Sequence, residues 1–173
     1  AWLRSHNLPG VMACTMHGSL LQIYPLLRTN SYKEAKFAIV PKEAANAKII
    51  KASGSALWYA NAAKDLLNSG LPSIDATCIR NELQKILQER FNVCGDVQVD
   101  SILRRHINKH FHHRFLKTIG FGPDIRVCRG LFDSQIGYID PVHLILISRF
   151  THDNGIVELL KNALESDSRS MQL

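Results

Sequence analysis

Residues 103–117, LRRHINKHFHHRFLK, bring together side chains that can bind a metal, transfer protons or contact phosphate. The segment holds five Arg or Lys, four His and two Phe, and it contains no acidic residue. Imidazole is a metal ligand and an acid–base group near neutral pH, and clustered cations attract polyanions. The sequence therefore poses three hypotheses for this segment: a metal site, a catalytic histidine cluster, or a surface that binds phosphate.

The metal hypothesis rests on His106 and His110, which are spaced one helical turn apart as in helical zinc sites. The segment lacks the glutamate that follows the first histidine in metalloprotease helices. Residues 101–123 contain no acid to orient an imidazole, and the neighbouring cations repel a dication. A complete ligand set would need Cys128 or His143 from elsewhere in the fold. We therefore expect no metal and no other cofactor.

The catalytic hypothesis comes from residues 110–112, His-Phe-His, which are similar to the paired histidines of rolling-circle nucleases. Those enzymes hold a metal between two histidines of one strand. On a helix, residues i and i+2 point about 200° apart and cannot share an ion. The sequence also lacks a Gly-x-Ser-x-Gly motif, a dinucleotide glycine pattern and a convincing cysteine–histidine pairing. We expect no catalytic residues, and a histidine-ligated metal enzyme or nuclease is the least favoured alternative.

The phosphate hypothesis follows from helical spacing. Leu103, Ile107, Phe111 and Phe115 recur every four residues and predict a buried stripe, which leaves the polar side chains facing outward. Each phosphate that such cations neutralise releases condensed counterions and adds affinity.

These outward-facing side chains, with two arginines in the expected following strand, predict a nucleic-acid contact surface. Arg104, Arg105 and Asn108 are the expected readers of base edges if the helix enters a groove. RNA and DNA are not distinguished. The full set of predicted contacts is Arg104, Arg105, Asn108, Lys109, His112, Arg114, Lys117, Arg126 and Arg129.

The distribution of charge along the chain allows a second function. Net charge is +6, and basic blocks at 1–64 and 101–130 alternate with acidic blocks at 65–100 and 131–173. A basic helix can dock on an acidic protein surface, including the chain's own residues 65–100. The alternative function is therefore a structural or assembly subunit, viral or ribonucleoprotein, that uses basic surfaces against protein or a membrane surface. A homo-oligomer or larger assembly is part of that alternative.

Cysteine spacing and hydropathy indicate the cellular compartment. The cysteines are scattered without any Cys-x-x-Cys pair, which predicts reduced thiols in an intracellular protein of the cytoplasm or nucleus. No apolar run approaches the ~18 residues of a membrane-spanning helix. The first residues lack a basic segment followed by an apolar one, so no signal peptide is expected. The four cysteines are Cys14, Cys78, Cys94 and Cys128.

Apolar spacing and capping residues predict three helices and then two strands, the element order of a winged helix. Ser53 and Asp100 are the expected N-caps of the first and third helices, and either Asp75 or Ser73 is the expected N-cap of the second. The predicted fold class is α+β, with a winged-helix-like unit at 53–150 that consists of three helices and a β-hairpin. The helices are expected at 54–70, 76–91 and 101–119, and the strands at 125–131 and 143–150.

Two further segments flank this unit. Residues 1–52 are expected to form an N-terminal layer packed on the core, with a β-hairpin at 11–27 and a short strand at 36–40. Residues 151–173 are expected to form a C-terminal helix that ends in a frayed tail. One compact domain overall is the alternative to separate units.

Overall fold

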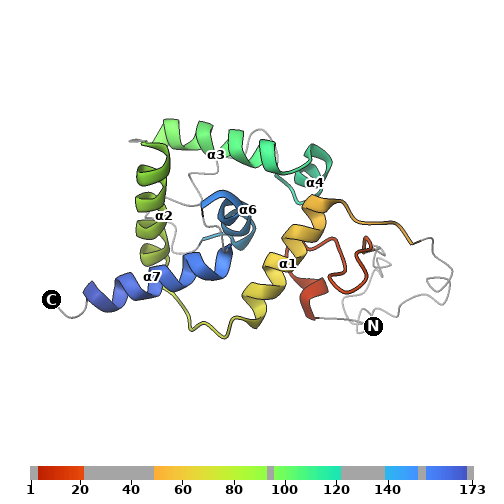
Figure 1. Ribbon diagram of the computed structural model, residues 1–173, viewed down its shortest axis with the longest axis horizontal. Helices are drawn as coiled ribbons and strands as arrows, with labels where there is room; N and C mark the ends of the chain where they lie inside the picture. The colour runs from red at the N-terminus through yellow and green to blue at the C-terminus, as the bar shows by residue number, and fades with distance from the viewer. Residues whose placement is uncertain (1–3, 22–48, 93–95, 122–138, 152–154, 171–173) are drawn as a thin grey trace, which may run out of the picture.

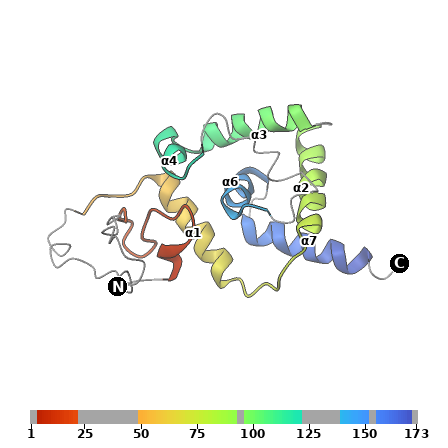
Figure 2. The ribbon, with the colours of Figure 1, turned by 180° about the vertical axis from the view of Figure 1, so that it is seen from behind.

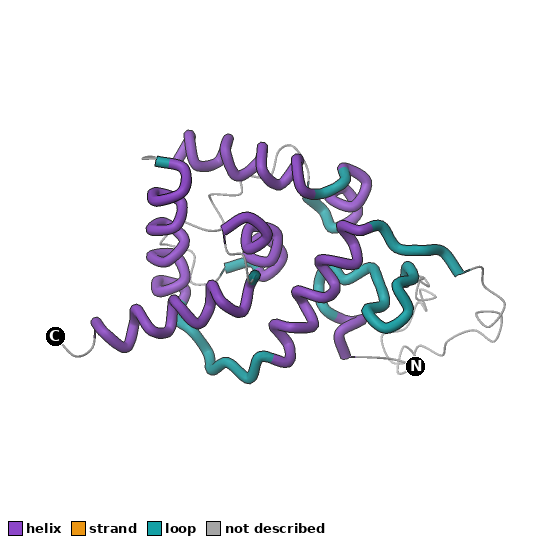
Figure 3. Tube along the Cα trace, in the orientation of Figure 1, coloured by secondary structure: helices purple, strands orange, loops and turns teal. Residues whose placement is uncertain are grey.

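The computed structural model describes residues 4–21, 49–92, 96–121, 139–151 and 155–170. Within these residues the protein is helical, and no strand is formed (Figures 1 and 3). None of the described helices combines the length and the apolar character that crossing a bilayer requires. The elements are the 3-10 helix η1 (Arg4–Asn7) and the α-helices α1 (Gly54–Asn68), α2 (Ala76–Phe91), α3 (Asp96–His110), α4 (His113–Thr118), α6 (Pro141–Thr151) and α7 (Ile156–Ser170).

Helix α6 lies at the centre of the molecule. In Figure 1 it is seen end-on, with α1, α2, α3 and α7 around it, and the view from behind in Figure 2 shows the same arrangement. It packs against all four of these helices. Every residue from Leu144 to Ser148 is buried, as is Thr151, so α6 is buried on all its faces.

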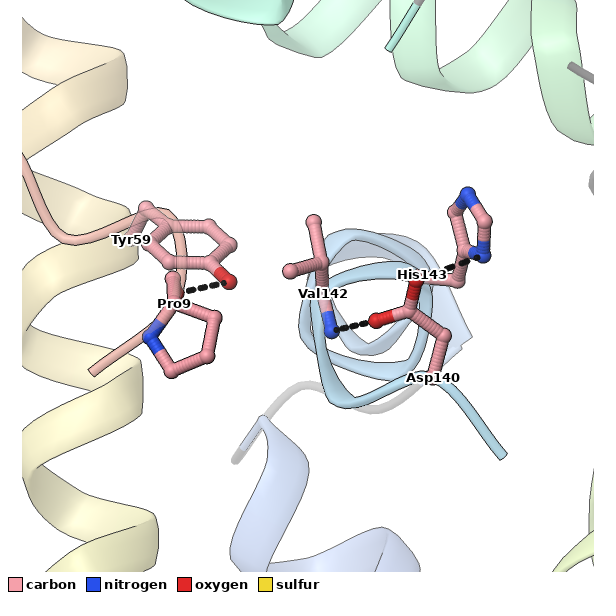
Figure 4. Close-up of polar contacts among 5 residues, drawn as sticks. All are labelled: Pro9, Tyr59, Asp140, Val142 and His143. Atoms are coloured by element: carbon pink, nitrogen blue, oxygen red, sulfur yellow. Dashed lines mark hydrogen bonds and ion pairs between the residues drawn. The ribbon is translucent and has the colours of Figure 1, made fainter. Parts of the chain in front are cut away.

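The sequence prediction of a strand at 143–150 is wrong, because these residues form α6. The preceding dipeptide starts the helix: Asp140 Oδ1 accepts a hydrogen bond from Val142 N at 2.8 Å (Figure 4), and Pro141 occupies the first helical position, where no N–H is needed. Within α6 the hydroxyls of Ser148 and Thr151 donate to backbone carbonyls one turn back, which satisfies them in the core. The four consecutive apolar residues 144–147 give no period that would separate a helix from a strand.

The predicted α+β winged-helix class is therefore incorrect, because the described residues contain no sheet. Of the predicted hairpin 11–27, residues 11–21 are described. They turn back on themselves with single bridges, Ala13 to Leu20 and Ser19 to Lys51, and no strand develops. The predicted strands 36–40 and 125–131 lie outside the described residues. The C-terminal helix is confirmed, but α7 continues to Ser170, where a frayed tail was expected.

The first two predicted helices are confirmed, together with their caps. Ser53 Oγ accepts from Ala56 N at 3.3 Å to begin α1, and Asp75 Oδ1 accepts from Thr77 N at 2.7 Å to begin α2. Buried Tyr59 ties α1 to the N-terminal segment, because its hydroxyl donates to the carbonyl of Pro9 at 3.0 Å (Figure 4).

The basic helix predicted as continuous over 101–119 is interrupted. Helix α3 starts earlier, at Asp96, and stops at His110, and α4 follows from His113. Between them His112 is extended, with φ −67° and ψ 136°, and its N–H donates to Ser55 Oγ on α1 at 3.1 Å. The buried stripe is nevertheless confirmed, since its four apolar side chains are between 0% and 5% exposed. Its members are Leu103, Ile107, Phe111 and Phe115.

We expect Leu146→Ala to destabilise the fold by about 2–5 kcal/mol, because it opens a cavity at the centre of the core. Urea unfolding measures the loss. Gln84→Ala, an exposed position on α2, is the matched control and should change stability by less than about 0.5 kcal/mol. Equal effects of the two substitutions would contradict the central position of α6.

Candidate nucleic-acid interface

A cluster of rings joins α2, α3 and α6 near their C-terminal ends. The His106 ring lies 4.8 Å from Phe91 and 5.2 Å from Phe150, measured between ring centroids. The His110 ring is 6.1 Å from Phe150 and is stacked 6.1 Å from His106. The last turn of α3 is thereby fixed against the last turn of α6.

Helix α1 completes this junction through Trp58. The guanidinium of Arg149 lies over the Trp58 ring, 5.0 Å from its centroid, which is cation–π geometry. The same ring meets Phe111 edge-on at 5.4 Å. Arg149 is exposed, whereas Trp58 is half-buried. The flat contact therefore holds a solvent-facing cation at a fixed place beside the end of α3.

Five cations of this region are exposed and form what we call the basic surface. Among the described residues, none of them forms an ion pair with a carboxylate. Such uncompensated charge creates a local positive potential that attracts anions. The basic surface consists of Arg105 and Lys109 on α3, Arg114 and Lys117 on α4, and Arg149 on α6.

The pair His106 and His110 lies beside these cations. His110 Nδ1 lies 3.1 Å from the carbonyl oxygen of His106 and must donate to it, which leaves Nε2 as the acceptor of the neutral ring. His106 Nδ1 is buried without a hydrogen-bond partner. Burial lowers the pKa of both imidazoles, and nearby cations lower it further: Lys109 and Arg105 at His106, and Arg149 first at His110. Each charge of the described residues that shifts the pKa values of the free pair therefore favours the neutral form.

His112 has a structural task, because its Nδ1 caps α4 by accepting a hydrogen bond from Arg114 N at 3.3 Å. Its ring lies 4.5 Å from that of His113, and both side chains are exposed. Capping holds the imidazole close to the backbone of α4, so His112 is less free to reach a ligand than the arginine and lysine side chains.

Of the nine predicted contact residues, the structure brings most to one region. Arg105, Asn108, Lys109, His112, Arg114 and Lys117 are exposed on α3, on α4 or at their junction. Arg104 differs, because it is half-buried and its Nε donates to Asp100 Oδ2 at 2.7 Å. Arg126 and Arg129 lie outside the described residues.

Sequence reasoning missed Arg149, and Arg90 next to it. Arg90 donates to the carbonyl of Phe150 at 3.3 Å, at the end of α6. Arg149 was hidden by the prediction of a strand at 143–150, whereas the contact of Arg90 joins residues 60 positions apart, which no local pattern predicts. A helical interpretation, begun by the Asp140-Pro141 pair, would have placed Arg149 in the last turn of a helix, where cations are favoured.

Two other pairs of reactive side chains occur in the described part of the chain. Cys14 Sγ lies 3.2 Å from His17 Nδ1, which corrects the expectation that no cysteine–histidine pair forms. The thiol is buried beside a tight turn at residues 15–17, and the contact spans three residues of the same turn. His143 Nδ1 lies 3.6 Å from Asp140 Oδ2 (Figure 4), and its ring is edge-on to Phe121, which fits packing at the start of α6.

The described residues contain no group of three His, Cys, Asp or Glu side chains close enough to hold a metal ion. No protein-family model, no curated protein and no solved structure matches this chain.

We expect the fold to lose stability as the pH falls from about 7.5 to about 5.5. His6, His106, His110 and His143 have pKa values lowered mainly by burial, so the unfolded chain binds more protons than the folded one in this range. Above the pKa of the unfolded chain, near 6.5, these histidines are neutral in both states and do not oppose folding. As the pH falls below that value, the unfolded chain takes up protons first and the free energy of unfolding decreases. Urea unfolding at both pH values measures the difference. Equal or greater stability at the lower pH would contradict these assignments.

Proposed function

We propose that the protein is a non-catalytic nucleic-acid-binding protein that contacts phosphates through the basic surface. The observation that carries this proposal is that five exposed cations on α3, α4 and the end of α6 have no carboxylate partner among the described residues. A phosphate chain supplies the missing negative charges at a spacing that several side chains can reach together. RNA and DNA offer the same phosphates, so either is a partner.

The supporting energetics come from counterion release. Each neutralised phosphate contributes a slope of about −0.9 to log K against log salt on duplex DNA, and about −0.7 on single strands. Five such contacts give useful affinity without reading any base. Exposed Asn108, on α3 between Arg105 and Lys109, offers the amide that can pair with an adenine edge.

Helix dipoles offer a structural explanation for some of the same cations. Lys109, Lys117 and Arg149 each lie in the last turn of a helix, where a cation is favoured by about 0.3–1 kcal/mol. Arg105 and Arg114 lie outside the last turns, so an interaction with the helix dipole does not explain a cation at these two positions. Phosphate binding accounts for both groups.

A reducing, intracellular location is part of the proposal. Cys14 and Cys78 carry free thiols, which supports a compartment where disulfides do not form. A role as an assembly subunit, in which the basic surface meets an acidic protein, is the alternative that the following experiment separates.

Replacing Arg105, Lys109 and Arg114 together by Gln should weaken nucleic-acid binding and reduce the magnitude of the salt slope by up to about 3, since up to three phosphate contacts are lost. Fluorescence anisotropy of labelled RNA and DNA oligonucleotides at two or more salt concentrations measures both quantities. The fold should survive, because each exposed substitution changes stability by less than about 0.5 kcal/mol.

The matched control removes the same charge elsewhere: Lys51, Lys64 and Lys161 are exposed and lie off the basic surface. Their triple Gln variant should keep nearly wild-type affinity and slope. If both triple variants lose affinity equally, binding depends on net charge alone. If the wild type binds neither RNA nor DNA in a salt-dependent way, the nucleic-acid proposal fails and the assembly role takes its place.

A further inference from the structure

We propose that nucleic-acid binding at the basic surface is coupled to proton uptake by the His106–His110 pair, so that affinity rises as the pH falls from about 8 to about 6. This inference rests on the proposed function and adds its regulation. It concerns two histidines that are not needed if arginine and lysine alone contact the phosphates.

The pair is surrounded by cations from each described element that packs on it. Arg105 and Lys109 act from α3 itself, Arg149 acts from α6, and α2 contributes Arg90, whose guanidinium is bonded to the end of α6. Among the described residues, the charges that shift the two pKa values are positive. A proton added to the free protein therefore meets both like charge and partial burial, which oppose it.

The hydrogen bonds of the pair fix where a proton can go. His110 already uses Nδ1–H on the carbonyl of His106, so its next proton binds at Nε2. Protonation changes Nε2 from an acceptor into a charged donor, which is the group that a phosphate oxygen accepts from most strongly. The rings of Phe91 and Phe150 hold the partner imidazole in place, so the pair does not have to be ordered on binding.

A bound phosphate reverses the electrostatic balance. It neutralises Arg105, Lys109 and Arg149, and it adds negative charge within reach of His110. The pKa of the pair, lowered by burial and by cations in the free protein, then rises in the complex. Because the complex binds more protons than the separate partners, lower pH favours the complex. The same linkage requires the bound polyanion to oppose the acid destabilisation of the fold.

The test measures the dissociation constant of a fluorescein-labelled, mixed-sequence single-stranded oligonucleotide at pH 8.0 and 6.0, at constant ionic strength. For the wild type we expect binding to be roughly tenfold tighter at pH 6.0, the change that uptake of about one proton produces over part of this range. His110→Gln should reduce this ratio to about twofold. His113→Gln removes an exposed imidazole outside the pair and should keep most of the ratio.

A second measurement needs no variant. Calorimetric titration of the wild type near pH 6.5, in buffers of different ionisation enthalpy, should show uptake of about one proton per complex. Salt-dependent binding with no proton uptake, or an unchanged pH ratio in His110→Gln, would overturn the coupling and leave the proposed function standing. Absence of binding at both pH values would overturn the proposed function and the coupling together.

Discussion

The structure depends on burying α6, a helix without a polar face. Such a helix is stable in water only when other elements cover every side of it, and here α1, α2, α3 and α7 do so. The arrangement of these helices also determines which side chains surround the C-terminal end of α6. The last turn of α6 emerges between α2, α3 and the start of α1, where Phe150 packs against His106 and Arg149 lies over Trp58. The basic surface is therefore a consequence of how the core is closed, and it is built on rigid helices.

Several acidic residues of the described chain are engaged in local structure. Asp75 caps α2, Asp100 pairs with Arg104 one turn away, and buried Glu82 lies 4.0 Å from Lys85. The sequence had left open that residues 65–100 neutralise the basic segment. Among the described residues, an ion pair between the acidic segment 65–100 and the basic segment joins Asp100 to Arg104, and both residues belong to α3. The five cations of the basic surface have no carboxylate partner among the described residues, and the described charges that lower the pKa values of the histidine pair are positive.

The sequence predicted those parts of the molecule that local signals determine. Caps at Ser53 and Asp75 marked α1 and α2, and four-residue spacing identified the buried side of α3 and α4 and, by exclusion, the exposed cations. The sequence-based prediction failed where the local structure depends on a distant residue or where the apolar pattern is ambiguous. The break at His112 depends on a hydrogen bond to Ser55, 57 residues away, and no glycine or proline marks it. The central helix was mistaken for a strand because residues 144–147 are consecutively apolar and such a run has no period. The omission of Arg149 follows from that error, as does the second strand of the expected winged helix.

The central claim is that an external polyanion binds the basic surface on α3, α4 and the end of α6. The most direct test is a two-dimensional ¹H–¹⁵N NMR titration of the labelled protein with a single-stranded oligonucleotide. We expect the largest amide shift changes in residues 105–117 and at Arg149, and small changes along α7, which lies across the core from α3 (Figure 1). Shift changes concentrated on α7 or on the loop at residues 11–21, or no shift changes at all at low salt, would contradict the claim.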